Sequence, residues 1–225
     1  MTDYTLTRSN RKTMSIQIKN GNVEVRSPLR LSKAEIDKFV KSKEKWITDN
    51  LAKSTALKER RENFTLNYCD KILYHGIEYP IIAKAGNRIG FDDTYFYIPL
   101  DLDSEQIKQA CIQIYKKLAK RDCTRKVMHF AKQMNVMPIA VKINSAKTRW
   151  GSCSAKKSLN FSWRLILADD DVIDYVVVHE LAHITEMNHS ARFWAIVENI
   201  LPDYKQHQER LKTISQKLSA EDWEK

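Results

Sequence analysis

The sequence predicts an α+β fold, with a β-rich first half followed by a mainly helical second half. Residues 12–27 alternate apolar and polar side chains about a turn, whereas residues 104–135 repeat apolar side chains at helical spacing. Two short apolar runs then precede a very apolar helix at residues 172–183. With 225 residues, 43% of them hydrophobic, the chain is long enough to bury a substantial core, which excludes a disordered or low-complexity protein.

The first segment predicts a β-hairpin and a basic helix. The hairpin spans residues 12–27 and turns at Asn20-Gly21-Asn22. Ser32 is expected to cap one helix that continues to about Ala56. Its expected apolar face comprises Ile36, Phe39, Val40, Trp46 and Ile47, and its lysines are Lys33, Lys38, Lys41, Lys43 and Lys45. These lysines are interpreted either as a solvated outer face or as a nucleic-acid contact.

Short Tyr-, Ile- and Phe-rich runs between residues 72 and 98 predict a small antiparallel meander, because Gly and Pro residues interrupt them. Residues 101–104 then mark a change from strand to helix periodicity. We therefore predict an N-terminal β-rich domain with a basic helix at residues 1–103, and a second domain at residues 104–225.

The second half begins with a long helix predicted from Ser104 to about Asn135. Strands at Ile139–Ile143 and about Leu159–Ile166 are expected to form a short antiparallel hairpin around a turn at Arg149–Cys153. Asp169, Asp170 and Asp171 then place negative charge at the start of the apolar helix, where the helix dipole favours it.

This apolar helix carries the motif H-E-x-x-H at residues 179–183. On a helix, His179 and His183 lie about 40° apart and one turn apart, so both imidazoles can reach one metal ion. Glu180 lies beside them, where a carboxylate can accept a proton from water during hydrolysis. The other histidines, His75, His129 and His207, lack such spacing and are expected to be surface or packing residues.

A third ligand is needed to complete a catalytic zinc site. His189 qualifies if the helix ends after His183, and Asn188 in a left-handed conformation followed by a Ser190 cap would provide that ending. Glu186 and Glu198 are the carboxylate alternatives. Three imidazoles favour Zn²⁺ over Mg²⁺ or Ca²⁺ and leave a coordination position open.

Several segments together resemble the YgjP-like family of zinc metallopeptidases, which is related to the SprT-like proteases. They are Arg11–Lys19, Lys43–Ile47, Trp150–Cys153, Asn160–Leu167, Val172–His183 and Asn188–Trp194. The resemblance implies a zincin-like catalytic domain in which His179, His183 and His189 bind zinc and Glu180 is the catalytic acid/base. The histidine spacing is also that of metzincins, but Glu186 stands where those enzymes carry Gly.

The favoured function is a zinc metallopeptidase that binds an extended peptide along the strand at about Asn160–Ile166. Candidate substrate-binding residues are Arg149, Trp150, Asn160 and Arg164, and Arg149, Arg164 or Tyr204 could stabilise the oxyanion. One alternative is a metal-dependent nucleotide phosphohydrolase, such as a nucleoside triphosphate pyrophosphatase, although no glycine-rich phosphate loop is present. Another is a nucleic-acid-associated zinc module.

The charge balance bears on partners and location. Lys and Arg total 38 against 28 Asp and Glu, a formal charge of +10 that favours acidic partners, including nucleic acid. The lysines concentrate in 33–45 and 116–132. No apolar segment is long enough to predict a membrane span or a signal peptide, so we expect a cytoplasmic protein without a membrane partner. The four widely spaced cysteines are expected to be reduced.

Overall fold

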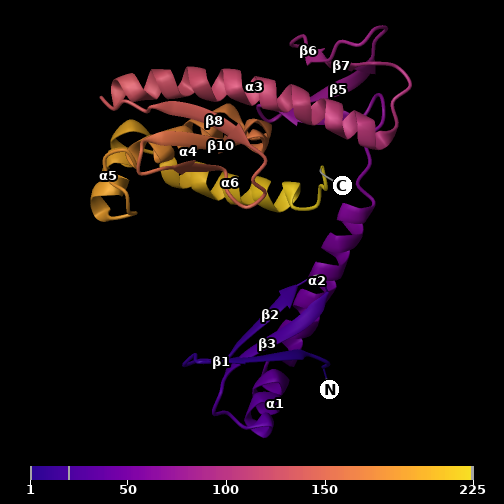
Figure 1. The fold of residues 1–225 in the computed structure, drawn as a ribbon, viewed down its shortest axis with the longest axis vertical. Helices are drawn as coiled ribbons and strands as arrows, with labels where there is room; N and C mark the ends of the chain where they lie inside the picture. The colour runs from indigo at the N-terminus through magenta and orange to yellow at the C-terminus, as the bar shows by residue number, and fades with distance from the viewer. Residues whose placement is uncertain (1, 20, 224–225) are drawn as a thin grey trace. The chain divides into compact units, whose positions relative to one another are not determined.

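The computed structural model describes residues 2–19 and 21–223 (Figure 1). Within these residues it contains six α-helices and three small mixed sheets, which confirms the α+β fold class. The chain divides into two compact units. Unit 1 runs to Phe64 and includes Ser219–Asp222, and unit 2 comprises Thr65–Leu218 with Trp223.

Unit 1 is a three-stranded sheet covered by two helices. Strands β2 (Ser15–Lys19) and β3 (Asn22–Pro28) are antiparallel, as the predicted hairpin requires, although Asn20 of its turn lies outside the described residues. Strand β1 (Thr5–Ser9), which the sequence analysis did not predict, pairs in parallel with β3. The core of the unit comprises Val23, Val25, Ile36, Val40 and Ile47.

The single basic helix predicted for this unit is wrong, because two helices meet at Lys43. Helix α1 (Lys33–Ser42) begins at Ser32, which forms a capping box with Glu35, and α2 runs over Glu44–Glu62. The break lets each helix turn its own apolar residues toward the sheet. Ile47 is consequently fully buried, whereas Trp46, expected on the apolar face, is 46% exposed.

Unit 2 begins with a four-stranded sheet, ordered β4-β5-β7-β6. Its strands are β4 (Lys71–Tyr74), β5 (Ile77–Ala83), β6 (Gly90–Phe91) and β7 (Phe96–Ile98). The predicted antiparallel meander is wrong at one pairing: β6 lies outside β7, so β5 and β7 run parallel. These strands belong to the second compact unit. The division into domains at residues 1–103 and 104–225 stays a prediction.

The second sheet of unit 2 also differs from the predicted hairpin. Strands β8 (Ala140–Asn144) and β10 (Ser158–Ser162) are parallel, and the segment expected as a turn supplies β9 (Gly151–Cys153), antiparallel to β10. Because β9 reverses the chain once more, β10 returns in the direction of β8 and lies at the centre of the sheet. The predicted second strand ends at Ser162, and Trp163–Leu167 form the 3₁₀ helix η1.

Four helices complete unit 2 and bury its core. Helix α3 (Ser104–Gln133) has a capping box between Asp103 and Gln106. Helix α4 (Asp170–Ala182) packs against α3, β9 and the two C-terminal helices, α5 (Ala191–Ile200) and α6 (Tyr204–Leu218). Because α4 is surrounded, nine of its residues are buried, which explains its apolar sequence. Within the described ranges, every helix is too short or too polar to cross a bilayer.

Candidate metal centre

The end of helix α4 and the turn that follows bring three histidines together. His179 lies in the last turn of α4, His183 is its C-terminal cap, and α5 begins at a Ser190 cap whose Oγ accepts the Phe193 N–H at 3.3 Å. The predicted helix ending is therefore confirmed. The expected left-handed Asn188 is wrong: its Oδ1 accepts the Ser190 N–H at 3.0 Å, and this side-chain turn reverses the chain instead.

The ligand atoms of His179, His183 and His189 all lie within 4.8 Å of one another. The Nε2 atoms of His179 and His189 are 3.0 Å apart. The fully buried ring of Phe193 lies 4.6–4.8 Å, centroid to centroid, from each of the three imidazoles. Among the described residues, neither Glu186 nor Glu198 belongs to this group, which favours His189 over the carboxylates as third ligand.

Contacts behind the imidazoles orient two of them. The Nδ1 of His183 lies 3.1 Å from the carbonyl oxygen of Glu186, so a proton on Nδ1 leaves Nε2 as the lone-pair donor. The indole of Trp194 stacks on His189 at 5.7 Å, and Tyr204 stacks on Trp194 at 5.2 Å. From the sequence, Trp194 is predicted only to lie on an apolar helix face; its stacking on His189 is seen only in the tertiary structure.

Burial controls the protonation of this group. Desolvation, and then the neighbouring imidazoles, lower the pKa of His179 to about 3, so this ring is neutral at physiological pH. Desolvation also lowers the pKa of His183. The Glu180 carboxyl is 6% exposed, and burial raises its pKa to about 7. Neutral imidazoles are the form that binds a metal ion.

These residues fit a divalent transition metal. Three neutral nitrogen donors converge on one point, and two of them approach to 3.0 Å, a distance that a shared cation would make favourable. The imidazoles come from two segments separated by a turn, and no fourth His, Cys, Asp or Glu of the described residues joins the group, as in a catalytic site.

Comparison with known proteins identifies the family. Residues 12–214 match the family described as YgjP-like, metallopeptidase domain. The chain belongs to this family. The YgjP-like domain is similar over part of its length to the metallopeptidase zymogen of Pyrococcus abyssi abylysin, with 23% identity and a TM-score of 0.40, covering 42% of this chain and 95% of that one. It is also similar to the metallopeptidase zymogen of Methanocaldococcus jannaschii jannalysin, with 26% identity and a TM-score of 0.37, covering 43% of this chain and 96% of that one. A search of curated proteins finds no match.

Strand β9 of the YgjP-like domain lies directly against Glu180. A Cβ atom on Gly151 would fall 2.6 Å from Oε1 of Glu180, so a larger residue here would displace the Glu180 side chain or β9. β9 is also an edge of its sheet, whereas β10 is paired on both sides. The prediction that a peptide adds to the strand at Asn160–Ile166 is therefore wrong, because the backbone of β10 has no free edge. The edge strand that contacts Glu180 is β9.

The remaining predicted site residues have different surroundings. Arg164 is buried, donates to the Ser145 carbonyl at 3.1 Å and stacks on Trp163, so it supports the loop before β9 and is not free to bind substrate. Trp150 donates through Nε1 to Ser215 on α6 at 3.1 Å. Asn160 lies on the central strand β10. Tyr204 is buried against Trp194, whereas Arg149 is exposed.

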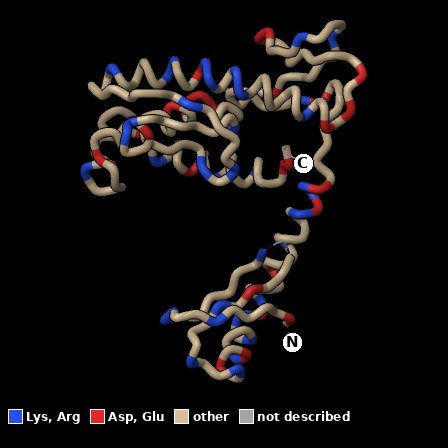
Figure 2. Tube along the Cα trace, viewed as in Figure 1, with Lys and Arg blue, Asp and Glu red and all other residues tan. Residues whose placement is uncertain are grey.

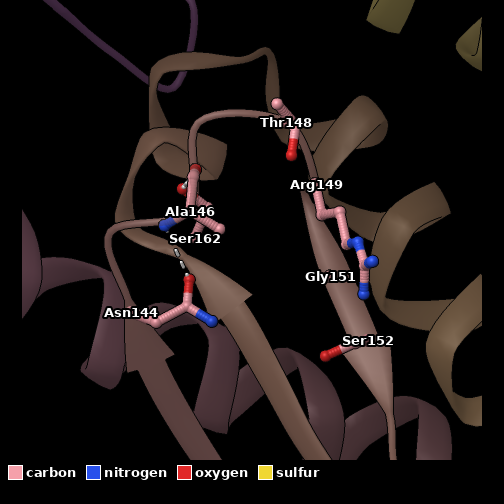
Figure 3. Close-up of a pocket in the computed structure, with 7 residues that line it drawn as sticks. All are labelled: Asn144, Ala146, Thr148, Arg149, Gly151, Ser152 and Ser162. Atoms are coloured by element: carbon pink, nitrogen blue, oxygen red, sulfur yellow. Dashed lines mark hydrogen bonds between the residues drawn. The ribbon is translucent and has the colours of Figure 1, made fainter.

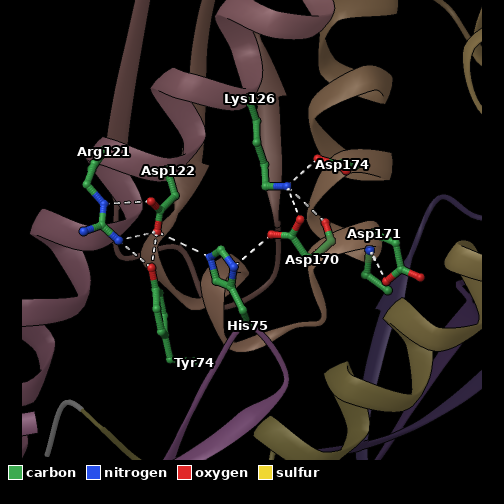
Figure 4. Close-up of polar contacts among 9 residues, drawn as sticks. Tyr74, His75, Arg121, Asp122, Lys126, Asp170, Asp171 and Asp174 are labelled. Carbon is green, nitrogen blue, oxygen red and sulfur yellow. Dashed lines mark hydrogen bonds and ion pairs between the residues drawn. The ribbon is translucent and has the colours of Figure 1, made fainter. Parts of the chain in front are cut away.

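A polar network attaches the N-terminal end of α4 to the rest of unit 2 (Figure 4). Buried Lys126 of α3 contacts Asp170 at 2.8 Å and Asp174 at 2.6 Å. His75, in the β4–β5 turn, bridges Asp170 at 2.8 Å and Asp122 at 3.4 Å. His75, expected to be a surface or packing residue, thus links the start of the helix that carries the metal group to α3.

Proposed function

We propose that this YgjP-like domain is a zinc-dependent peptidase with Glu180 as general base. The observation that carries the proposal is the geometry of one turn of α4. The imidazoles of His179 and His183 converge with that of His189, the neighbouring Glu180 is buried, and the edge strand β9 lies against its carboxylate. Membership in a metallopeptidase family supports a metal and a polypeptide substrate.

Each residue has a distinct role in this proposal. His179, His183 and His189 would hold the ion. When bound, Zn²⁺ supplies Lewis-acid chemistry and activates water. The Glu180 carboxylate would accept the proton from the attacking water and pass it to the departing amine. The free edge of β9 would hold the peptide extended by backbone hydrogen bonds.

The test is the Glu180→Gln variant, which is nearly isosteric and removes only the base. We expect this variant to keep its zinc and its fold and to lose at least about 100-fold in the rate of hydrolysis of an unfolded protein substrate. Zinc content is measured by metal analysis after dialysis. Undiminished proteolysis at equal zinc content would contradict the mechanism.

The same two proteins are tested with nucleoside triphosphates in a phosphate-release assay. Glu180-dependent nucleotide hydrolysis without proteolysis would replace the peptidase by the alternative phosphohydrolase.

A further inference from the structure

A cavity of about 320 Å³ lies beside β9 (Figure 3). It is lined by Asn144, Ala146, Thr148, Arg149, Gly151, Ser152 and Ser162. Gly151 belongs both to this lining and to the contact with Glu180. The cavity and the Glu180 carboxylate therefore have Gly151 of β9 as a common neighbour.

The lining of the cavity is positively charged and rich in hydrogen-bond donors. Arg149 carries its only formal charge, and no Asp or Glu contributes to it. Asn144 uses Oδ1 to accept the Ala146 N–H at 3.0 Å, which leaves its Nδ2 as a donor. Figure 3 shows the side chains of Asn144 and Ser152 pointing into the space between their strands, with Arg149 extending along β9. The hydroxyls of Thr148 and Ser152 add further donors.

The walls of the cavity are preorganised. Ser162 donates through Oγ to the Ala146 carbonyl at 2.8 Å and through its backbone N–H to the Trp150 carbonyl at 2.9 Å. Arg164 holds the Ser145 carbonyl from the buried side. The loop from Asn144 to Trp150 is thus attached at three points, which lowers the entropic cost of binding.

We infer that this cavity is a specificity subsite for a carboxylate of the substrate, with Arg149 as its charged partner. The inference rests on the proposed peptidase function. Charge-assisted hydrogen bonds from Arg to a carboxylate are the strongest that such a lining can form. The volume is near the lower end for ligand sites, about 300–1,000 Å³, which suits one acidic side chain or a chain terminus. An acidic side chain and a C-terminus both present a carboxylate, and the experiment below distinguishes them.

The first experiment measures kcat/KM for peptides that differ only in Asp or Glu against Asn or Gln at each position, and in a free against an amidated C-terminus. We expect about a tenfold preference for one carboxylate form, as a charge-assisted bond provides. Arg149→Ala should abolish this preference and Arg149→Glu should reverse it toward Lys. Arg192→Ala, which removes an exposed arginine of α5 outside the lining, is the matched control.

A second experiment separates this inference from the proposed function. Binding of the same labelled peptides to zinc-loaded Glu180→Gln is measured by fluorescence anisotropy, with and without Arg149→Ala. Arg149-dependent binding of the acidic peptide without cleavage by the unsubstituted protein would keep the subsite and overturn the peptidase. Cleavage without any carboxylate preference would keep the peptidase and overturn the subsite. Arg149-dependent binding of a nucleoside triphosphate, but not of acidic peptides, would overturn the assignment to a carboxylate.

A separate observation concerns unit 1. Residues 1–64 contain 15 Lys and Arg against 8 Asp and Glu, so they carry +7 of the formal +10 (Figure 2). Trp46, Lys53 and Arg60 on α2 are spaced by seven residues and therefore lie in a line along one helix face, about 10 Å apart. All three are exposed. Within the described residues, neither Lys53 nor Arg60 forms an ion pair.

We propose that this face of α2, Trp46, Lys53 and Arg60, binds single-stranded nucleic acid. Lys38, Lys41 and Lys45 are also exposed and add to the positive charge of unit 1, which complements phosphate. The exposed indole supplies the base-stacking surface that duplexes, whose bases are already stacked, do not engage.

The test is anisotropy of a labelled single-stranded oligonucleotide with the full chain at several salt concentrations. We expect affinity to fall steeply between about 50 and 200 mM salt. Trp46→Ala should weaken binding about tenfold, Trp46→Phe should restore most of it, and the double variant Lys53→Glu with Arg60→Glu should abolish it. The control is Lys116→Glu with Lys117→Glu, an equal charge reversal on α3. An equal loss of affinity in this control, or full binding by Trp46→Ala, would overturn the proposal. Displacement of the oligonucleotide by polyglutamate at equal charge concentration would overturn it as well.

Discussion

At the scale of single residues, hydrogen bonding and stacking decide which atoms of the metal group face one another. His183 is oriented by the Glu186 carbonyl and His189 by the indole of Trp194. Glu186 thus helps to orient His183 through its backbone carbonyl, while its carboxylate is not part of the donor group. Oriented ligands of this kind bind a metal more tightly than freely rotating ones.

The assignment of His189 as the third metal ligand is tested by its removal. His189→Ala should lower zinc affinity at least about tenfold, since a donor is lost, whereas Glu186→Gln and Glu198→Gln should retain it. The measurement is competition for zinc with a chromophoric chelator, with circular dichroism to check the fold. Retained affinity in His189→Ala together with loss in either glutamine variant would reassign the ligand.

The contact between Gly151 and Glu180 is tested by a substitution of the glycine. A methyl group at this position would overlap Oε1 of Glu180 at 2.6 Å, so Gly151→Ala must displace either the carboxylate or β9. We expect kcat/KM to fall about 100-fold, the scale of an ångström-sized misplacement, while zinc content is unchanged. Normal turnover by a fully zinc-loaded Gly151→Ala protein would show that the contact is not needed.

At the scale of elements, the β4–β5 hairpin holds α4 in place. Its two-residue turn consists of His75 and Gly76, both with positive φ, 49° and 76°, as a tight hairpin turn requires. His75 contacts Asp170 at the start of α4, and Gly76 approaches Asp169 so closely that a Cβ would lie 1.8 Å from its Oδ1. The helix that carries the metal group is therefore positioned by a turn more than 90 residues earlier in the chain.

Gly76→Ala tests this attachment. We expect a loss of about 2 kcal/mol or more in the free energy of unfolding, from backbone strain and the clash with Asp169. Gly86→Ala is the matched control: its φ is +97°, but a Cβ there would meet no atom within 4 Å. Denaturant unfolding of both variants separates strain from clash. Equal destabilisation would mean that the contact with α4 contributes nothing.

At the scale of the whole molecule, the network around Asp122 links stability to pH. Burial raises the pKa of this carboxyl, but hydrogen bonds with His75, Arg121 and Tyr74 outweigh burial and lower the pKa below its usual range. The folded state therefore binds a proton less readily than the unfolded state. The resulting stabilisation is complete above the unfolded pKa of about 4 and disappears as pH falls toward the lower folded value.

Asp122→Asn tests this dependence. The variant should unfold at a lower temperature than the unsubstituted protein at pH 7, and the difference should shrink as the pH is lowered below about 4. Thermal unfolding across this pH range provides the measurement. Asp49→Asn, which removes an exposed carboxylate of α2, controls for the change in net charge. A difference that stays constant with pH would assign the effect of Asp122→Asn to packing.

By itself, the sequence determined the features that depend on local spacing. The Ser32 and Ser190 caps, the antiparallel hairpin at residues 12–27 and the α3 helix depend on residues close together in the chain, and the structure confirms them. The H-E-x-x-H spacing is equally local, and it brings His179 and His183 into one group with His189. Only the tertiary structure decided the pairing of β8 with β10, the break at Lys43, and the contacts of Gly151 with Glu180 and of Gly76 with Asp169. The pairing and these contacts join residues far apart in the chain, and the break depends on how α1 and α2 pack against the sheet of unit 1. Because such contacts depend on which surfaces exclude water from each other, local patterns of apolar and polar residues do not encode them.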